Sequence, residues 1–256
     1  MDLFINAFNT ILCQPLLNAL ILLYEYLPGH SFGIAIIVLT ILIKLIFYPL
    51  GVKGIRSQKA LSQLQPKIKE VKEKFKNDKE KQARAMMELY KQEKINPVSG
   101  CLPLLIQLPI LFALFRVFWR GFGEEQLGFL YSFVPYPGQI NTVFLGMIDL
   151  AKGCTEKITE NGLEYSVYLW PTIILVLLVG ITQFIQTKMA TPPRRAGEGK
   201  GQPDFSQMMQ KQMLYFFPIV TVFILWRLPA AIALYWMTTT LFTIGQQYLI
   251  FKKRSS

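Results

Sequence analysis

The sequence predicts an all-α, polytopic membrane protein, and three observations lead to this fold class. Of the 256 residues, 52% are hydrophobic, and the mean hydropathy is +0.34, which is more than the surface of a soluble domain of this size accommodates. The apolar residues gather in stretches of about 20, the length of helix that crosses the hydrocarbon core of a bilayer. The 27 Lys and Arg and 16 Asp and Glu lie mainly between those stretches, as connecting loops require.

Five apolar stretches predict five transmembrane helices. The first three cover residues 31–50, 100–119 and 168–189. The apolar block that follows contains two more, at 209–227 and 229–251, because Arg227 and Pro229 interrupt it and proline cannot continue a helix. A short turn at Arg227-Leu228-Pro229 is therefore expected between the last two spans.

Residues 1–30 form a sixth apolar stretch that polar residues interrupt repeatedly. This pattern favours an amphipathic helix that lies in the membrane interface on the extracytoplasmic side over a helix that crosses the bilayer. The acidic start Met1-Asp2 has no basic segment ahead of the apolar run, which argues against a cleaved signal peptide. The interrupting residues are Asn6, Asn9, Gln14, Pro15 and Asn18.

The charges of the loops predict the orientation. Residues 51–99 carry 13 Lys and Arg against 6 Asp and Glu, a net charge of +7, and the segments 190–208 and 252–256 are also basic. Residues 120–167 are acidic. Basic loops stay in the cytoplasm, so the N-terminus and 120–167 are expected outside and the C-terminus inside. A six-span arrangement would move only the N-terminus, and charge alone does not distinguish the two.

The basic segment 51–99 has a helical pattern of its own. Apolar residues recur at intervals of three and four and form a seam along one helix face. Asn77-Asp78 then predicts a turn, and a second helical run covers 79–94. We expect a cytoplasmic helical hairpin. Its lysines either dock a ribosome, a targeting factor or anionic lipid, or only keep the helices solvated and set the topology, and both roles can coexist. The seam consists of Leu61, Leu64, Ile68, Val71 and Phe75.

Lys44 lies inside the first predicted span, where a charge costs about 2.5–3.5 kcal/mol. It is roughly 9 Å from the end of that span, so its side chain either snorkels to the interface or has a function. Neighbouring spans also carry polar side chains at helical spacing, which predicts a hydrated cavity around Lys44. The alternative is ordinary hydrogen bonding between helices. The candidate site consists of Lys44, Thr40, Gln107, Gln183, Gln186, Tyr235, Trp236, Thr240 and Thr243.

The residues of ordinary catalytic sites are scarce. His30 is the single histidine, and no hydrolase or phosphate-binding motif occurs, so we expect neither an enzyme nor a metal or cofactor site. Cys13, Cys101 and Cys154 have no metal-binding spacing, and a disulfide between Cys13 and Cys154 is the disfavoured interpretation. Arg116 lies near the outer end of its span, where snorkelling explains it, and it is assigned no role.

Several sequence runs resemble the YidC membrane protein insertases, which are relatives of the mitochondrial Oxa and thylakoid Albino insertases. The similarity covers nearly the whole chain. The second-span run and the Leu-Tyr-Trp of the fifth span are the most specific parts. The matching runs are Thr40-Ile-Leu-Ile-Lys-Leu-Ile-Phe-Tyr-Pro49, Leu64-Gln-Pro-Lys-Ile68, Met87-Glu-Leu-Tyr-Lys91, Asn96-Pro-Val-Ser-Gly-Cys-Leu-Pro-Leu-Leu-Ile-Gln-Leu-Pro109, Phe184-Ile-Gln-Thr-Lys-Met189 and Pro229-Ala-Ala-Ile-Ala-Leu-Tyr-Trp236.

The resemblance implies a five-helix core in a bacterial inner membrane, with a cytoplasm-open hydrophilic groove. In that family the positive charge of the groove is usually an arginine, and Lys44 occupies the matching position here. Lysine keeps the charge but loses the planar guanidinium fork that binds carboxylates with two hydrogen bonds. The chain also lacks a large periplasmic domain after its first helix and so resembles the short members.

The implied function is the energy-independent insertion of nascent membrane proteins. The implied partners are those clients, membrane lipids, and the ribosome, signal recognition particle pathway and Sec translocon, with no specific nucleic-acid substrate. Two other classes remain open on the residues alone. One is a small transporter or channel with Lys44 as its substrate or proton site, although no internal repeat supports it. The other is a structural assembly partner in which Lys44 is dispensable.

Overall fold

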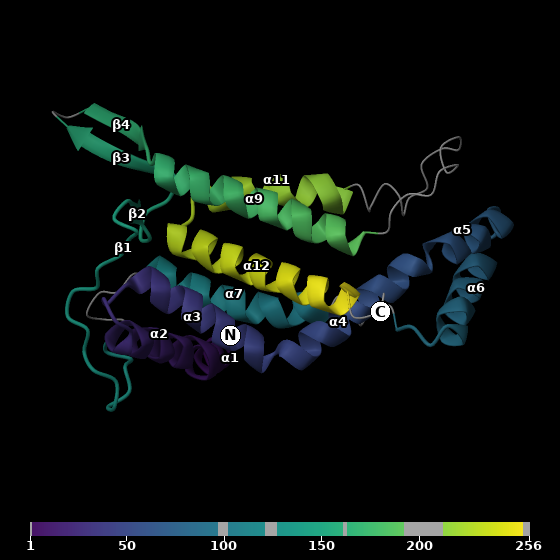
Figure 1. Cartoon of the computed structure of the whole chain (residues 1–256), viewed down its shortest axis with the longest axis horizontal. Helices are drawn as coiled ribbons and strands as arrows, with labels where there is room; N and C mark the ends of the chain where they lie inside the picture. The colour runs from purple at the N-terminus through teal and green to yellow at the C-terminus, as the bar shows by residue number, and fades with distance from the viewer. Residues whose placement is uncertain (1, 97–101, 121–126, 161–162, 192–211, 253–256) are drawn as a thin grey trace.

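The computed structural model describes residues 2–96, 102–120, 127–160, 163–191 and 212–252. This part of the chain is mostly helical (Figure 1), in agreement with the predicted helical membrane fold. The helices are α1 (Asp2–Phe8), the π-helix η1 (Asn9–Cys13), α2 (Gln14–Tyr26), α3 (Phe32–Ile46), α4 (Tyr48–Gln63), α5 (Gln65–Lys74), α6 (Lys79–Gln92), α7 (Leu102–Arg120), α9 (Trp170–Ala190), the π-helix η3 (Gln212–Phe216), α11 (Phe217–Leu225) and α12 (Ala230–Lys252).

The long apolar helices form a bundle around α12. Helix α12 packs against α9 on one side and α3 on the other, while α11 packs on α9 and α2 packs on α3 (Figure 1). The shared core is hydrophobic, and it includes the fully buried Leu20, Ala35, Val176 and Leu225. Close helix packing needs small residues. Gly180 of α9 is one, because a Cβ there would lie 2.7 Å from the Val222 side chain of α11.

Two described helices are long and apolar enough to cross a membrane, Ile5–Tyr26 and Trp170–Ala190. Helices α3 and α4 together would make a third span that is bent by 71°, and Leu105–Trp119 and Leu214–Leu225 are apolar but shorter. These helices fit a polytopic membrane protein. The count of five spans stays a prediction, and so does the interfacial position of the N-terminal helix, whose length and composition would also suit a crossing.

The first predicted span does not continue straight to residue 50. Helix α3 ends at Ile46, and α4 begins at Tyr48 in a new direction. Pro49 explains the break, because proline has no N–H to donate and its ring clashes with the preceding turn, whereas it is well tolerated in the first turn of a new helix. Helix α4 extends away from the bundle. It contacts the end of α12 through Lys59, whose Nζ lies 4.4 Å from the centre of the Phe251 ring.

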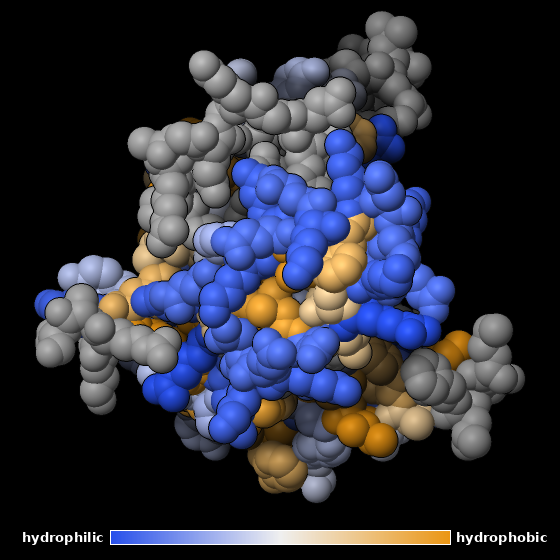
Figure 2. Space-filling view, turned by 90° about the vertical axis from the view of Figure 1, so that its right-hand side faces the viewer, coloured by the Kyte–Doolittle hydropathy of each residue, from blue (hydrophilic) through white to orange (hydrophobic). Residues whose placement is uncertain are grey.

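The segment 51–99 contains two helices that pack together, α5 and α6. Asp78 precedes α6 and caps it, because its Oδ1 accepts a hydrogen bond from the backbone N–H of Lys81 at 3.0 Å. The Gln82 side chain of α6 donates to the Lys72 carbonyl of α5 at 3.1 Å, and Lys67 forms an ion pair with Glu93. Figure 2 views this end of the molecule, where hydrophilic side chains surround patches of hydrophobic surface.

The region 120–167 contains strands, which the all-α expectation did not include. Strands β1 (Val143–Phe144) and β2 (Ile148–Asp149) pair antiparallel, and so do β3 (Thr155–Glu160) and β4 (Leu163–Tyr168), with Thr155 opposite Tyr168. Alternating polar and β-branched or aromatic residues favour strands. The sequence between β3 and β4 is Asn161-Gly162, outside the described residues, and this dipeptide is typical of tight hairpins.

The same region docks onto the turn between α11 and α12. The backbone N–H groups of Ala230 and Ala231 donate to the carbonyls of Lys152 and Leu150, at 2.8 and 3.0 Å, and Cys154 N–H donates to Trp226 O at 3.1 Å. The first N–H groups of a helix have no partner within it. The loop therefore supplies the acceptors that the start of α12 needs, and the predicted turn at 227–229 lies beneath it.

Candidate functional site

Lys44 lies in the last turn of α3, two residues before the helix ends. Its position follows from the break at Phe47, which places the lysine beside the start of α7 rather than in the middle of a straight span. The residue is half-buried. Its ammonium therefore needs hydrogen-bond acceptors from neighbouring helices or from water.

Three candidate residues from three helices form one hydrogen-bonded chain. The Lys44 Nζ donates to Gln107 Oε1 of α7 at 3.2 Å. The Gln107 Nε2 in turn donates to the Tyr235 hydroxyl of α12, and Tyr235 is only 2% exposed. A glutamine amide suits this middle position because it accepts through its oxygen and donates through its nitrogen. Lys44 has no ion-pair partner among the described residues, since Gln107 and Tyr235 are both neutral.

The three threonines of the predicted site bond to their own helices. Thr40 Oγ1 donates to the Ile36 carbonyl at 2.6 Å, Thr240 Oγ1 to Trp236 at 2.9 Å, and Thr243 Oγ1 to Thr239 at 2.8 Å. A hydroxyl that bonds back to the preceding turn is satisfied within an apolar helix. These threonines therefore add polarity near Lys44 without requiring a partner from another helix.

Polar atoms in α9 and α12 are buried without a partner among the described residues. They include Oγ1 of Thr172, Oε1 of Gln183 and Oε1 of Gln247. Buried polar groups are usually hydrogen-bonded to protein or to water, and ordered water satisfies them where protein groups do not. Gln186 and Trp236 are partly buried on the same two helices, and the structure shows no direct contact between them and Lys44 among its hydrogen bonds.

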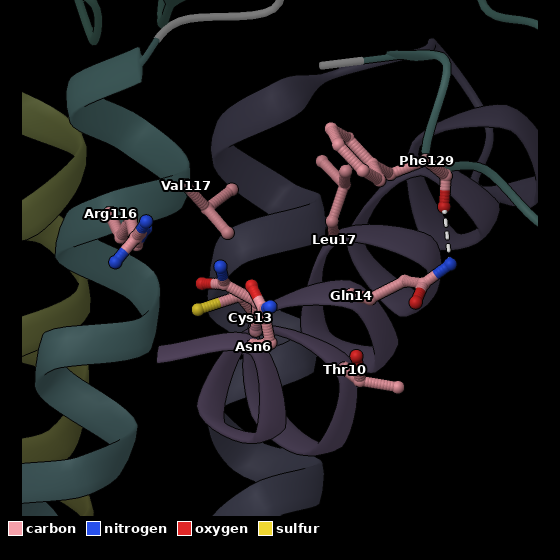
Figure 3. A pocket seen from close by; sticks show the side chains of 9 residues that line it. Asn6, Thr10, Cys13, Gln14, Leu17, Arg116, Val117 and Phe129 are labelled. Carbon is pink, nitrogen blue, oxygen red and sulfur yellow. Dashed lines mark hydrogen bonds between the residues drawn. The ribbon is translucent and has the colours of Figure 1, made fainter. Parts of the chain in front are cut away.

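A second polar cluster surrounds Arg116, to which sequence reasoning assigned no role. Arg116 and Val117 of α7 face Asn6, Thr10, Cys13, Gln14 and Leu17 of the N-terminal helix across a pocket of about 250 Å³ (Figure 3). Asn9 and Phe129 complete its lining. Phe129 is held by Gln14, whose Nε2 donates to the Phe129 carbonyl at 3.0 Å. The polar residues that interrupt the N-terminal helix thus gather against an arginine.

Among the described residues, no group of three or more His, Cys, Asp or Glu side chains could hold a metal ion. Cys13 and Cys154 are separate thiols, and Cys101 lies outside the described residues. Burial raises the pKa of the Cys154 thiol to about 11, so this cysteine stays protonated at neutral pH and is a poor nucleophile.

Comparison with known proteins places the chain in a family. Residues 22–256 match the model of the family described as the 60Kd inner membrane protein. A protein of Fusobacterium nucleatum named "Membrane protein insertase YidC" is 36% identical over 223 residues, which cover 87% of each of the two chains.

Longer proteins with the same name are also similar. The protein of Geobacter metallireducens is 34% identical over 241 residues, and that of Syntrophus aciditrophicus is 35% identical over 242 residues. Each alignment covers 94% of this chain but only 37% and 36% of these relatives, so the chain spans little more than a third of their length. The match over nearly the whole of this chain shows that it belongs to the 60Kd inner membrane protein family, which includes the YidC insertases.

Proposed function

We propose that this chain is a membrane protein insertase that works without an enzymatic step. A nascent apolar segment with a short, acidic extracytoplasmic tail would enter a hydrophilic groove from the cytoplasm, and Lys44 would attract the tail. The segment would then slide along the helices into lipid, because burial of its apolar surface is favourable. The observation that carries the proposal is the hydrogen-bonded series Lys44–Gln107–Tyr235, in which a cation of α3 is linked to neutral side chains of two other helices.

The electrostatics favour an acidic client over an internal counter-ion. An ammonium among apolar helices gains most from an opposite charge, and here the described residues offer it an amide. The attraction between unit charges is about 1 kcal/mol at 4 Å in water and about 4 kcal/mol at an effective dielectric of 20. A client carboxylate near Lys44 would therefore be attracted more strongly than it is in bulk water.

The buried, unpaired oxygens of Thr172, Gln183 and Gln247 support a hydrated path beside this cation. Water in the path would shorten the hydrocarbon that a polar tail must cross and so lower its cost. We assign the groove to Lys44, Thr40, Gln107, Gln183, Gln186, Tyr235, Trp236, Thr240 and Thr243, in a five-span core with the N-terminus outside and the C-terminus in the cytoplasm.

The partners of this function are client chains and membrane lipids. The basic segment 51–99, with α5 and α6, would receive the ribosome, a component of the signal recognition particle pathway or the Sec translocon. Exposed lysines on these helices are suited to long-range attraction of anionic partners.

Site-specific crosslinking to a stalled nascent chain tests the groove. A photoreactive residue would replace Lys44, Gln186 or Trp236 in turn, and each should crosslink to the client's apolar segment. The control position is Phe223 of α11, which is 76% exposed on a helix outside the proposed groove. Equal crosslinking at Phe223, or none at the three groove positions, would remove the groove from the proposal.

Reconstitution in liposomes tests the function itself. The purified chain should insert a short client with an acidic tail and should not conduct small solutes. Solute flux without client insertion would replace the insertase with the transporter or channel interpretation.

A further inference from the structure

The pocket at Arg116 is separate from the proposed groove. Arg116 lies nine residues after Gln107 along α7, on the opposite face of the helix. One wall of the pocket comes from residues 6–17 of the N-terminal helix, and this segment precedes the part of the chain that matches the family model. Its volume of about 250 Å³ far exceeds the ~10–15 Å³ that a single water needs. The pocket therefore has room for a chemical group of several heavy atoms.

The charge of Arg116 has no counterpart among the side chains that the structure describes. Arg116 takes part in none of their ion pairs, and its Nε is buried without a hydrogen-bond partner among them. The described lining contains no Asp or Glu. Arg116 is half-buried, and a charged group that is partly removed from water without an anion is costly, so the pocket favours a negatively charged ligand.

The polar wall of the pocket supplies further hydrogen-bond donors. Asn6, Asn9, Thr10 and Gln14 recur at helical spacing on one face of the N-terminal helix. The π-helix η1 covers Asn9–Cys13, and π-helical turns inside α-helices occur frequently at functional sites. Asn9 has a buried Oδ1 without a described partner, and a half-turn of its amide would present two N–H donors instead.

The surroundings of the pocket are those of a lipid rather than of a soluble anion. On α7, Phe112 lies one turn before Arg116 and Trp119 one turn after it, and each is 59% exposed. Ile11 of η1 is 70% exposed. These apolar side chains lie outside the pocket lining, on the two helices that form its walls, where they suit acyl chains, and tryptophan is enriched at the level of lipid headgroups.

The depth of the pocket agrees with a headgroup. Arg116 is four residues, or roughly 6 Å, from the end of α7 at Arg120. The neighbouring Phe118 packs edge-on against Phe32, the first residue of α3, with ring centroids 6.2 Å apart. Arg116 therefore lies at the end of the bundle that is predicted to face the extracytoplasmic interface of the membrane, where lipid phosphates lie.

We infer that this pocket binds the phosphate of an anionic phospholipid, with the Arg116 guanidinium as its charged donor and the amides of Asn6 and Asn9 beside it. The guanidinium fork matches two phosphate oxygens, and the acyl chains lie against Phe112, Trp119 and Ile11. The bound lipid joins the N-terminal helix to α7.

Native mass spectrometry of the purified full chain in neutral detergent tests this site. The probes are phosphatidylglycerol and phosphatidylcholine with identical acyl chains, and the measurement is the dissociation constant of the first bound lipid. Wild type should bind phosphatidylglycerol about tenfold more tightly. Arg116→Gln should abolish the preference, and Arg116→Lys should retain part of it, because it keeps the charge and loses the fork.

Arg227→Gln is the matched control, because Arg227 is an exposed arginine in the turn before α12, at the same end of the bundle. It should leave the preference unchanged. Asn9→Leu should weaken the preference with Arg116 intact, and it keeps the test valid if Arg116→Gln does not fold. Equal binding of both lipids by wild type, an unchanged preference in Arg116→Gln, or an equal loss in Arg227→Gln would overturn the inference. Displacement of the lipid by millimolar glycerol phosphate would also overturn it, since the site would then recognise a soluble phosphate.

Discussion

Two cations within apolar helices, Lys44 of α3 and Arg116 of α7, have opposite environments. Lys44 donates to an amide that is itself held by Tyr235, so its position is fixed by contacts among three helices of the bundle. Arg116 faces a pocket and has no described ion-pair partner. A cation held by neutral groups is suited to an anionic segment that passes by, whereas a cation that lines a pocket is suited to an anion that stays bound. The lipid-binding measurement described above tests the role of Arg116, and the predictions below test the role of Lys44 and the packing of the bundle around it.

Reversal of the charge at Lys44 should have the largest effect. Lys44→Glu should reduce insertion of a client with an acidic tail at least tenfold, because like charges then meet in the groove. Lys44→Ala should be milder, and a client with a neutral tail should be affected least. The measurement is protease protection of the client's tail in reconstituted liposomes.

Lys44→Arg is the control for this change, since it keeps the positive charge and should retain insertion. Wild-type insertion by both Lys44→Ala and Lys44→Glu would show that Lys44 is dispensable, as in the structural assembly partner.

Loss of the neighbours that hold Lys44 should have a smaller effect. Gln107→Leu and Tyr235→Phe each remove part of the hydrogen-bonded chain, and a hydrogen bond contributes about 0.5–1.5 kcal/mol, so we expect a roughly two- to tenfold loss of insertion. In a double-mutant cycle, Gln107→Leu should add little to Lys44→Ala, because the two residues act as a unit.

Tyr248→Phe is the matched control for Tyr235→Phe, because Tyr248 is on the same helix and is 58% exposed. If Gln107→Leu and Lys44→Ala were fully additive, the hydrogen bond between their side chains would have no role in insertion.

Two glycine substitutions should have the smallest effect on function. They change no charge and so test the packing of the helices alone. Gly180→Ala places a Cβ 2.7 Å from Val222, whereas a Cβ at Gly245 meets nothing within 4 Å. We expect Gly180→Ala to destabilise the protein by about 1–3 kcal/mol through overpacking, and Gly245→Ala to stabilise it by up to about 1 kcal/mol through helix propensity.

Thermal unfolding in detergent measures both variants, which should shift in opposite directions. A lower melting temperature for Gly245→Ala than for Gly180→Ala would contradict the close approach of α9 and α11.

Sequence patterns predicted the helical membrane fold and the family, because apolar length and motif order are local properties of a chain. The polar side chains that share a helix face in the spans around Lys44 were also predicted, since helical spacing shows which residues share a face. Which of these polar side chains contact one another could not be predicted, because the hydrogen bond between Lys44 and Gln107 joins residues 63 positions apart in the sequence. Only the folded chain shows that Gln107 accepts from Lys44 and in turn donates to Tyr235.

Other features were missed although their signals were present. Pro49 is a helix breaker in the first span, and Asn161-Gly162 between two alternating segments is a hairpin signal. Asn6, Asn9, Thr10 and Gln14 share one helical face, which could have been read as a polar surface in need of a partner. That Arg116 of α7 lies opposite them depends on tertiary packing, which one sequence does not reveal.

The bend at Phe47 has a mechanical consequence. Helix α4 is 16 residues long, or about 24 Å, so a 10° swing about Phe47 would displace its far end by about 4 Å. Lys44 lies on the other side of the pivot, in α3, and such a swing leaves it in place. The bend therefore separates the orientation of α4, and of α5 that follows it, from the position of the Lys44 ammonium.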